Sequence, residues 1–117
     1  MKKTLRFEDL EIWKESMRVC TAVYDALKTC KDFGFKDQIQ RASVSVPSNI
    51  AEGHERKSIK EYTQFLYIAK GSCGELRTQL YLSASLEYIT KETGLKLIEQ
   101  YLALSVKIYN YIQSINK

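Results

Sequence analysis

The sequence lacks most of the residue patterns on which enzymes and metalloproteins are built. Its 117 residues include one histidine, one proline, five glycines and three cysteines. So few turn-forming residues argue against an all-β fold with many tight turns. The single histidine, His54, excludes a di-iron site made of two Glu-x-x-His motifs within one chain, and it excludes an H-E-x-x-H zinc site. The absence of a C-x-x-C pair removes the common zinc and haem signatures.

Long apolar runs and a serine-hydrolase motif are also missing. No apolar segment approaches the roughly 18 residues that a membrane span needs, and the start, MKKTLRFEDLEIW, has no apolar region typical of a signal peptide. No G-x-S-x-G surrounds any serine. Cys20, Cys30 and Cys73 are interpreted as reduced thiols of a cytoplasmic protein. The sequence therefore predicts a cytoplasmic non-enzyme with no cofactor, no metal, no membrane partner and no small-molecule substrate.

What the sequence does contain is helical periodicity. Its length suits a single domain that spans residues 1–117. Apolar residues recur at spacings of three and four in four segments, residues 7–30, 36–53, 58–88 and 90–116. Long helices with short connections form antiparallel bundles. We therefore predict an all-α, up-down-up-down four-helix bundle.

The first two segments have distinct apolar stripes. In the first segment the predicted core residues are Leu10, Trp13, Met17, Cys20, Tyr24 and Leu27. In the second they are Ile39, Ala42, Val46 and Ile50. Pro47 should kink the second helix, because it cannot donate to the Ser43 carbonyl; the alternative is a new helix after Val46, which has no good cap. Gly53 is expected to end this helix beneath Trp13.

A polar stripe beside the second apolar stripe predicts contacts between helices. Asn49 and Glu52 belong to it and are interpreted as inward or interhelical hydrogen-bonding residues. Arg41 belongs to it as well, and we predict an ion pair between Arg41 and Glu75 of the third helix.

The third and fourth segments carry clear helix-start signals. Ser58 with Glu61 is a capping box, and Thr90 is a plausible N-cap. The predicted core face of the third helix contains Tyr62, Phe65, Leu66, Ala69, Cys73, Leu76 and Leu80. Gly71 and Gly74 lie inside the third helix, where each costs about 1 kcal/mol against alanine. A glycine inside a helix usually allows a neighbouring backbone to approach closely, so we expect such a close approach at Gly71 and Gly74.

The fourth segment has more apolar surface than an isolated bundle needs. One stripe is expected to serve the core; it contains Leu95, Ile98, Leu102, Tyr109 and Ile112. The other is predicted to be a subunit interface; it contains Tyr101, Leu104, Ile108, Tyr111 and Ile115. The alternative is that Tyr101 and Tyr111 lie on the surface with their hydroxyls in water.

The net charge of +4 permits an acidic partner without demanding one. Candidate nucleic-acid contacts are Lys2, Lys3 and Arg6 near the start and Arg56, Lys57 and Lys60 between the second and third helices. Interleaved acidic residues make a simply solvated basic surface an equal alternative. His54 is expected to be solvated at the end of the second helix. A helix-turn-helix around Gly53 is disfavoured, since the helix that follows is too long.

Three sequence runs together resemble a known family. They are the run from Phe7 to Trp13, the run Ser45-Val46-Pro47-Ser48-Asn49-Ile50-Ala51-Glu52-Gly53, and Gly71-Ser72 followed by Glu75-Leu76. The chain resembles the small proteins encoded in intervening sequences of bacterial 23S rRNA genes, and departs from many of them in its short connection before the second helix.

The resemblance implies a four-helix bundle, commonly a ring-shaped homopentamer, with no established enzymatic activity. A similar branch, the accessory variability-determinant proteins of diversity-generating retroelements, is more basic and binds nucleic acid. The resemblance supplies no functional residues to carry across. We therefore expect a homo-oligomeric assembly module, with RNA binding by a basic face of the oligomer as the alternative.

Overall fold

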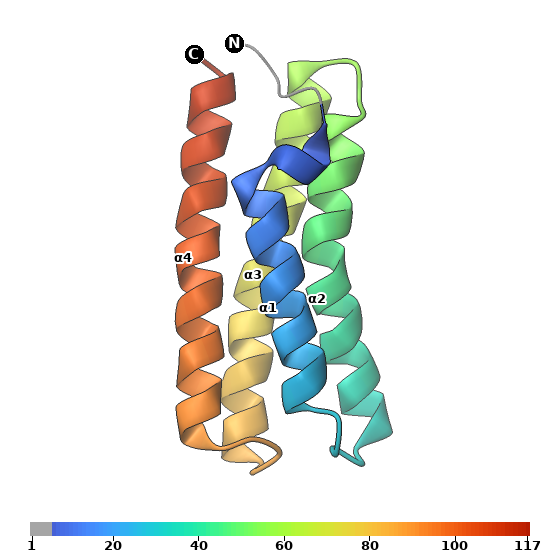
Figure 1. Cartoon of the computed structure of the whole chain (residues 1–117), viewed down its shortest axis with the longest axis vertical. Helices are drawn as coiled ribbons and strands as arrows, with labels where there is room; N and C mark the ends of the chain where they lie inside the picture. Colours follow the sequence, from blue (N-terminus) through green and yellow to red (C-terminus); the bar gives the residue numbers. More distant parts are fainter. Residues whose placement is uncertain (1–5) are drawn as a thin grey trace.

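The computed structural model describes residues 6–117, which form four long helices and one short 3-10 turn. The turn η1 (Phe7–Asp9) precedes α1 (Glu11–Ala26), α2 (Phe33–His54), α3 (Ile59–Ser85) and α4 (Lys91–Ile115). The helices run up and down in sequence order and enclose one core, in a bundle of 45 × 21 × 20 Å (Figure 1). This confirms the predicted four-helix bundle.

Side-chain caps explain where three of the helices begin. The carboxylate of Asp32, the hydroxyl of Ser58 and the hydroxyl of Thr90 each accept a hydrogen bond from a backbone N–H three residues later, at 3.1–3.2 Å. Each cap satisfies one of the donors that a helix leaves unpaired at its start. The predicted caps Ser58 and Thr90 are thus confirmed. The second helix begins at Phe33, three residues before the predicted start, because Asp32 caps it.

The end of α3 also follows from local hydrogen bonds. The N–H of Tyr88 donates to the Ser83 carbonyl at 2.8 Å, and the N–H of Glu87 donates to the Ala84 carbonyl at 3.1 Å. This pair of bonds is the Schellman motif, which needs a residue of positive φ just past the helix. Glu87 takes that conformation with a φ of 63°. The positive φ of Glu87 thus ends α3 and turns the chain toward α4.

The core stripe of α1 differs from the predicted one. Met17 and Tyr24 were predicted to be inside, but they are 42% and 41% exposed. The side chains that α1 buries along its length are Ile12, Ser16, Val19 and Val23. Ser16 is tolerated there because its hydroxyl donates to the Trp13 carbonyl at 2.7 Å. The face of α1 that packs against the other helices is therefore the one with the smaller side chains, and the larger Met17 and Tyr24 lie outside it.

The predicted core of α2 and α3 is confirmed except at Phe65, which is half-buried. Ile39, Val46 and Ile50 of α2 are fully buried, as are Leu66, Cys73, Leu76 and Leu80 of α3. The helix α2 continues through Pro47, so the alternative of a separate helix after Val46 is wrong. Pro47 itself is buried, and the bundle around it holds the helix together.

Candidate interaction surfaces

The described part of the chain lacks a cluster of metal-ligating side chains, and the thiol of Cys73 is shielded from solvent. Within residues 6–117, no three side chains of the His, Cys, Asp and Glu type are grouped so that they could hold a metal ion. Among the helices in that range, none has the length and apolar character needed to cross a membrane. Burial raises the pKa of Cys73 to about 12, so its thiol stays protonated and unreactive.

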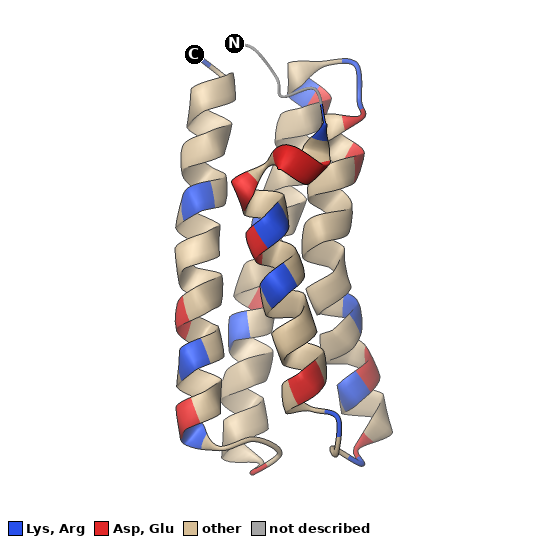
Figure 2. Cartoon of the chain, viewed as in Figure 1, with Lys and Arg blue, Asp and Glu red and all other residues tan. Residues whose placement is uncertain are grey.

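The predicted basic residues gather only partly, at the end of the bundle where α2 turns into α3. Arg56 pairs with Glu52 at 2.7 Å and lies 4.8 Å from the centre of the Phe65 ring, while Arg6 pairs with Glu8 at 3.6 Å. Lys57 and Lys60 are exposed. Figure 2 shows acidic and basic residues interleaved at this end. Lys2 and Lys3 lie outside the described residues.

The predicted ion pair between Arg41 and Glu75 is wrong. Arg41 pairs instead with Asp37, one turn earlier on its own helix, with 2.8 Å between its Nε and the carboxylate. Its side chain is 80% exposed, so it is held outside the bundle. A hydrogen bond joins α2 and α3 here: the hydroxyl oxygens of Ser45 and Ser72 lie 2.9 Å apart.

Two other members of the predicted polar stripe have different roles. The amide nitrogen of Asn49 donates to both the carbonyl and the hydroxyl of Ser45, at 2.8 and 2.9 Å. Asn49 therefore supports the interhelical contact through Ser45. Glu52 was expected to bond between helices, but it points outward to Arg56 on the same side of α2.

Close packing occurs at Gly53 and not at Gly71 and Gly74, where it was expected. A Cβ added at Gly53 would lie 2.7 Å from the Phe65 Cβ and 3.0 Å from the Tyr62 Cδ1. Gly53 therefore lies closely against α3. Trp13 makes an edge contact with Phe7, with 5.4 Å between the ring centres. A Cβ at Gly71 or Gly74 would meet nothing within 4 Å. The expected close approach of a neighbouring backbone is thus absent at α3 within the described chain.

His54 is buried, although it was expected to be solvated. Its side chain is 3% exposed, and its ring makes edge contacts with Tyr62 at 5.7 Å and Phe7 at 6.3 Å between ring centres. Tyr62 in turn shares a hydrogen bond with Tyr111, with 2.9 Å between the hydroxyl oxygens. Burial raises the pKa of Tyr62. These rings close the end of the core. Pattern reasoning missed this because η1 folds over the end of α2.

The five residues predicted to form the α4 interface point into the core. Tyr101 and Ile108 are fully buried, Leu104 and Ile115 are at most 3% exposed, and Tyr111 is half-buried. They are therefore unavailable to a second copy. The exposed apolar residues of α4 are Leu95, Leu102, Val106 and Tyr109, at 54%, 50%, 52% and 44%. Of the five residues predicted for the core stripe of α4, Ile98 and Ile112 are buried as predicted, whereas Leu95, Leu102 and Tyr109 are exposed.

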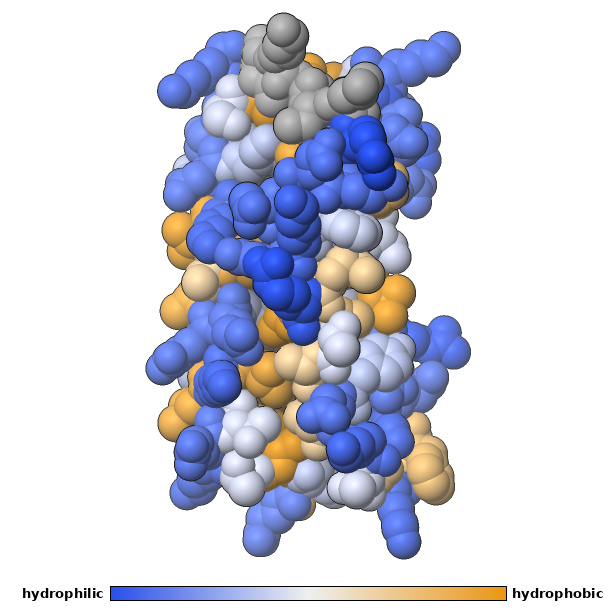
Figure 3. Space-filling model, viewed as in Figure 1, coloured by the Kyte–Doolittle hydropathy of each residue, from blue (hydrophilic) through white to orange (hydrophobic). Residues whose placement is uncertain are grey.

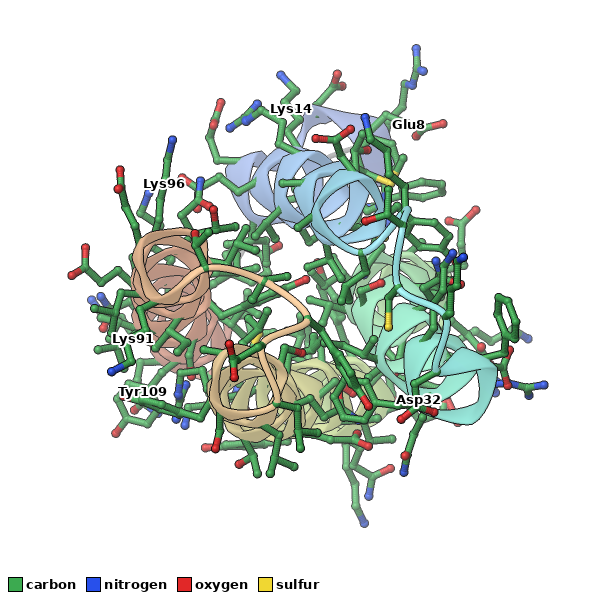
Figure 4. The ribbon with its side chains drawn as sticks, turned by 90° about the horizontal axis from the view of Figure 1, so that it is seen from below. Glu8, Lys14, Asp32, Lys91, Lys96 and Tyr109 are labelled. Carbon is green, nitrogen blue, oxygen red and sulfur yellow. The ribbon has the colours of Figure 1, made fainter. Side chains whose placement is uncertain are left out.

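The exposed apolar residues of α4 lie beside exposed residues of α3. Gly94 of α4 contacts Ala84 of α3, and the Asn116 amide donates to the Thr63 hydroxyl at 2.9 Å, so these two helices are antiparallel neighbours along their length. Figure 4 shows Tyr109 on the side of α4 that lies toward α3. We define the α3–α4 face by the residues Tyr67, Gly71, Gly74, Tyr81, Leu95, Leu102, Val106 and Tyr109.

Hydrophobic surface is visible along α4. Figure 3 shows hydrophobic (orange) atoms along the α4 edge of the molecule, at the left of the view. Leu95, Leu102 and Tyr109 repeat at intervals of seven residues, and so do Tyr67, Gly74 and Tyr81 on α3. Repeats of seven keep side chains on one face of a helix along its length. The exposed apolar residues of the α3–α4 face are thus aligned along the two helices and are not scattered around them.

A hollow of about 1110 Å³ opens where α1, α4 and the α3–α4 loop meet. Small side chains line it, among them Ala22 and Ala26, which leave α1 and α4 apart at this end. Its edge carries charges of both signs, and Figure 4 shows Lys91 and Lys96 extending outward from α4.

Comparison with known proteins places the chain in a family. The family model of the 23S rRNA-intervening sequence protein matches residues 8–110. A solved structure of similar fold is a protein of unknown function from the S23 ribosomal protein family of Bacteroides thetaiotaomicron; it is 24% identical, with a TM-score of 0.80, over 86% of this chain and 97% of that one. A search of curated proteins gives no match. The chain belongs to the family of 23S rRNA-intervening sequence proteins.

Proposed function

We propose that this chain is a non-catalytic helical module that acts in the cytoplasm and assembles with copies of itself. The observation that carries the proposal is the α3–α4 face. Leu95, Leu102 and Val106 are each half-exposed or more, in a strip that continues onto Tyr67 and Tyr81 of α3. Single exposed apolar residues are ordinary, whereas a contiguous strip of them is typical of a protein interface.

The dimensions of the bundle are those that an assembly requires. Stable interfaces bury about 800 Å² on each partner. One side of a bundle 45 Å long and about 20 Å wide offers an area of this order. Aromatic residues are enriched in such interfaces, and the α3–α4 face contains three tyrosines. A ring of five copies is the assembly that we propose, in line with the resemblance of the sequence.

Light scattering on protein eluting from a sizing column tests the proposal. At micromolar concentration we expect a single species of about five times the 13.6 kDa chain mass. Association through half-exposed apolar side chains should persist at high salt, since it does not depend on screened charges. A species of 13.6 kDa at every concentration tested would contradict self-association.

RNA binding at the end of the bundle between α2 and α3 is the second candidate function. The observation in its favour is that Lys57 and Lys60 are exposed on the turn that also holds Arg56. In a ring these residues would be repeated around one rim, which would raise the local positive potential. The neighbouring Glu52 and Glu55 reduce that potential, so this function ranks second.

Salt dependence separates RNA binding from adventitious association. We expect binding to an RNA oligonucleotide to weaken steeply between about 50 and 200 mM salt if several phosphates are contacted. Replacing Lys57 and Lys60 by glutamate should remove the binding. The matched control replaces Lys91 and Lys96, which lie at the opposite end of the bundle (Figure 1). Equal affinity of the two double variants would exclude this site.

A further inference from the structure

Two sides of α3 are open to contact, and they carry opposite charges. Thr63 contacts α4, and Lys70 and Arg77 follow it at intervals of seven residues, so they lie on the α4 side. Ser72 contacts α2, and Glu75 follows it by three residues, so Glu75 lies toward the α2 side. The cations and the carboxylate therefore lie on opposite sides of the same helix.

Arg77 carries a charge that the chain itself does not neutralise. Its side chain is half-buried beside the α3–α4 face, and one terminal guanidinium nitrogen is fully covered without a hydrogen-bond partner. Among the described residues, no carboxylate lies within 4.0 Å of it. That nitrogen is enclosed by the chain's own atoms, so a partner could reach only the part of Arg77 that remains accessible, where its charge has no carboxylate of the described residues beside it and a carboxylate from another copy would be favoured.

Glu75 is the matching acidic residue on the other side of α3. It is exposed, its carboxylate accepts one long hydrogen bond of 3.4 Å from Gln79 on the same helix, and no cation of the described chain lies within 4.0 Å. Exposed apolar residues stand seven positions before and after it, Ile68 at 51% and Leu82 at 47%. The α2 side of α3 thus has the same layout as the α4 side, with a charge at mid-length and apolar residues above and below.

Symmetry brings these two sides together. In a closed ring, a patch on one side of each copy meets a different patch on the next copy. If the ring axis runs along the bundle, equivalent residues of neighbouring copies lie at the same height. Glu75 and Arg77 are two residues apart, or about 3 Å along a helix. They therefore match in height between neighbouring copies, and Tyr67 and Tyr81 then lie level with Ile68 and Leu82.

We propose that Arg77 of one copy binds Glu75 of the next copy and fixes the register of the ring. This inference rests on the proposed self-association. The open positions at Gly71 and Gly74 fit the same arrangement, because the absence of side chains there lets a neighbouring helix approach α3 closely. Within one chain these two glycines have no such neighbour.

Charge reversal tests the pair. Light scattering and sedimentation are measured on the wild type, on Glu75→Arg, on Arg77→Glu and on the double variant that exchanges the two charges. Each single variant should raise the dissociation constant roughly 30-fold or more, because it leaves like charges facing each other across an interface. The exchanged pair should restore at least part of the wild-type affinity. Glu11→Arg, on an exposed position of α1, the helix that does not pack against α3, is the matched control and should assemble like the wild type.

The possible outcomes are separable. A wild type that is monomeric would overturn the proposed function and this inference together. A wild type that assembles while both single variants assemble equally well would overturn only the pairing of Glu75 with Arg77. Glu75 is exposed, so Glu75→Arg should remain folded, and circular dichroism verifies that its loss of assembly is not loss of structure. Failure of the exchanged pair to regain affinity over both single variants also counts against the pairing.

Discussion

Replacing Leu104 by aspartate is expected to unfold the protein at 25 °C. The side chain of Leu104 is 1% exposed and lies in the core, so an aspartate there would be withdrawn from water. Burial of a charge costs about 4 kcal/mol or more, and domains of this size are stable by roughly 5–15 kcal/mol. Loss of the leucine's apolar contacts adds to the cost. Circular dichroism and urea unfolding measure the effect.

The matched control is Leu102→Asp, two residues earlier on the same helix. Leu102 is 50% exposed on the α3–α4 face, so the change should alter the free energy of unfolding of the single chain by only about 0.5 kcal/mol. We expect this variant to be folded and monomeric, since an aspartate on the interface stays hydrated only when no partner covers it. A folded Leu104→Asp protein, or an unfolded Leu102→Asp protein, would contradict the orientation of α4.

Gly53→Ala is expected to lower the free energy of unfolding by about 1–2 kcal/mol. The new Cβ would lie 2.7 Å from the Phe65 Cβ, which is attached to the backbone and cannot rotate away. The helices α2 and α3 must then separate, at a cost of about 1–3 kcal/mol for overpacking. The better helix propensity of alanine recovers about 1 kcal/mol at most. The midpoint of thermal unfolding should fall by roughly 5 °C.

Gly71→Ala is the control for this change and should act in the opposite direction. Nothing lies within 4 Å of a Cβ at Gly71, so the alanine side chain fits without a clash. Its higher helix propensity should stabilise the single chain by up to about 1 kcal/mol. Both alanine variants are best compared in the Leu102→Asp background, because assembly would otherwise add a concentration-dependent term. Equal midpoints for the two variants would contradict the close contact at Gly53.

The sequence was most informative where a pattern had one physical reading. Ser58 and Thr90 start α3 and α4 as predicted, because a hydroxyl placed before a helical segment can satisfy the first free backbone donors. The core face of α3 was predictable as well, from Tyr62 to Leu80. The opposite face of α3 mixes glycine, tyrosine and charged residues, so no second fully apolar stripe competed with the first over most of that length.

The helices α1 and α4 were harder because each has two apolar stripes. On α1, the larger side chains of Met17 and Tyr24 suggested the wrong one. On α4, Leu104 and Leu102 are chemically equal, and only the position of the neighbouring helices makes one of them 1% and the other 50% exposed. Periodicity gives the stripes of a helix, but it does not say which of two faces its neighbours cover.

By itself, the sequence determined the number and order of the helices, the caps of α3 and α4, and membership in a family that carries the same motifs. Only the tertiary structure decided that Gly53 has no room for a side chain, that His54 is buried, and that Arg41 stays on the surface. It also decided that one covered nitrogen of Arg77 has no hydrogen-bond partner among the described residues. The reason is physical. Caps and periodicity depend on neighbours within a few residues along the chain, whereas burial and charge pairing depend on atoms that other helices bring into contact.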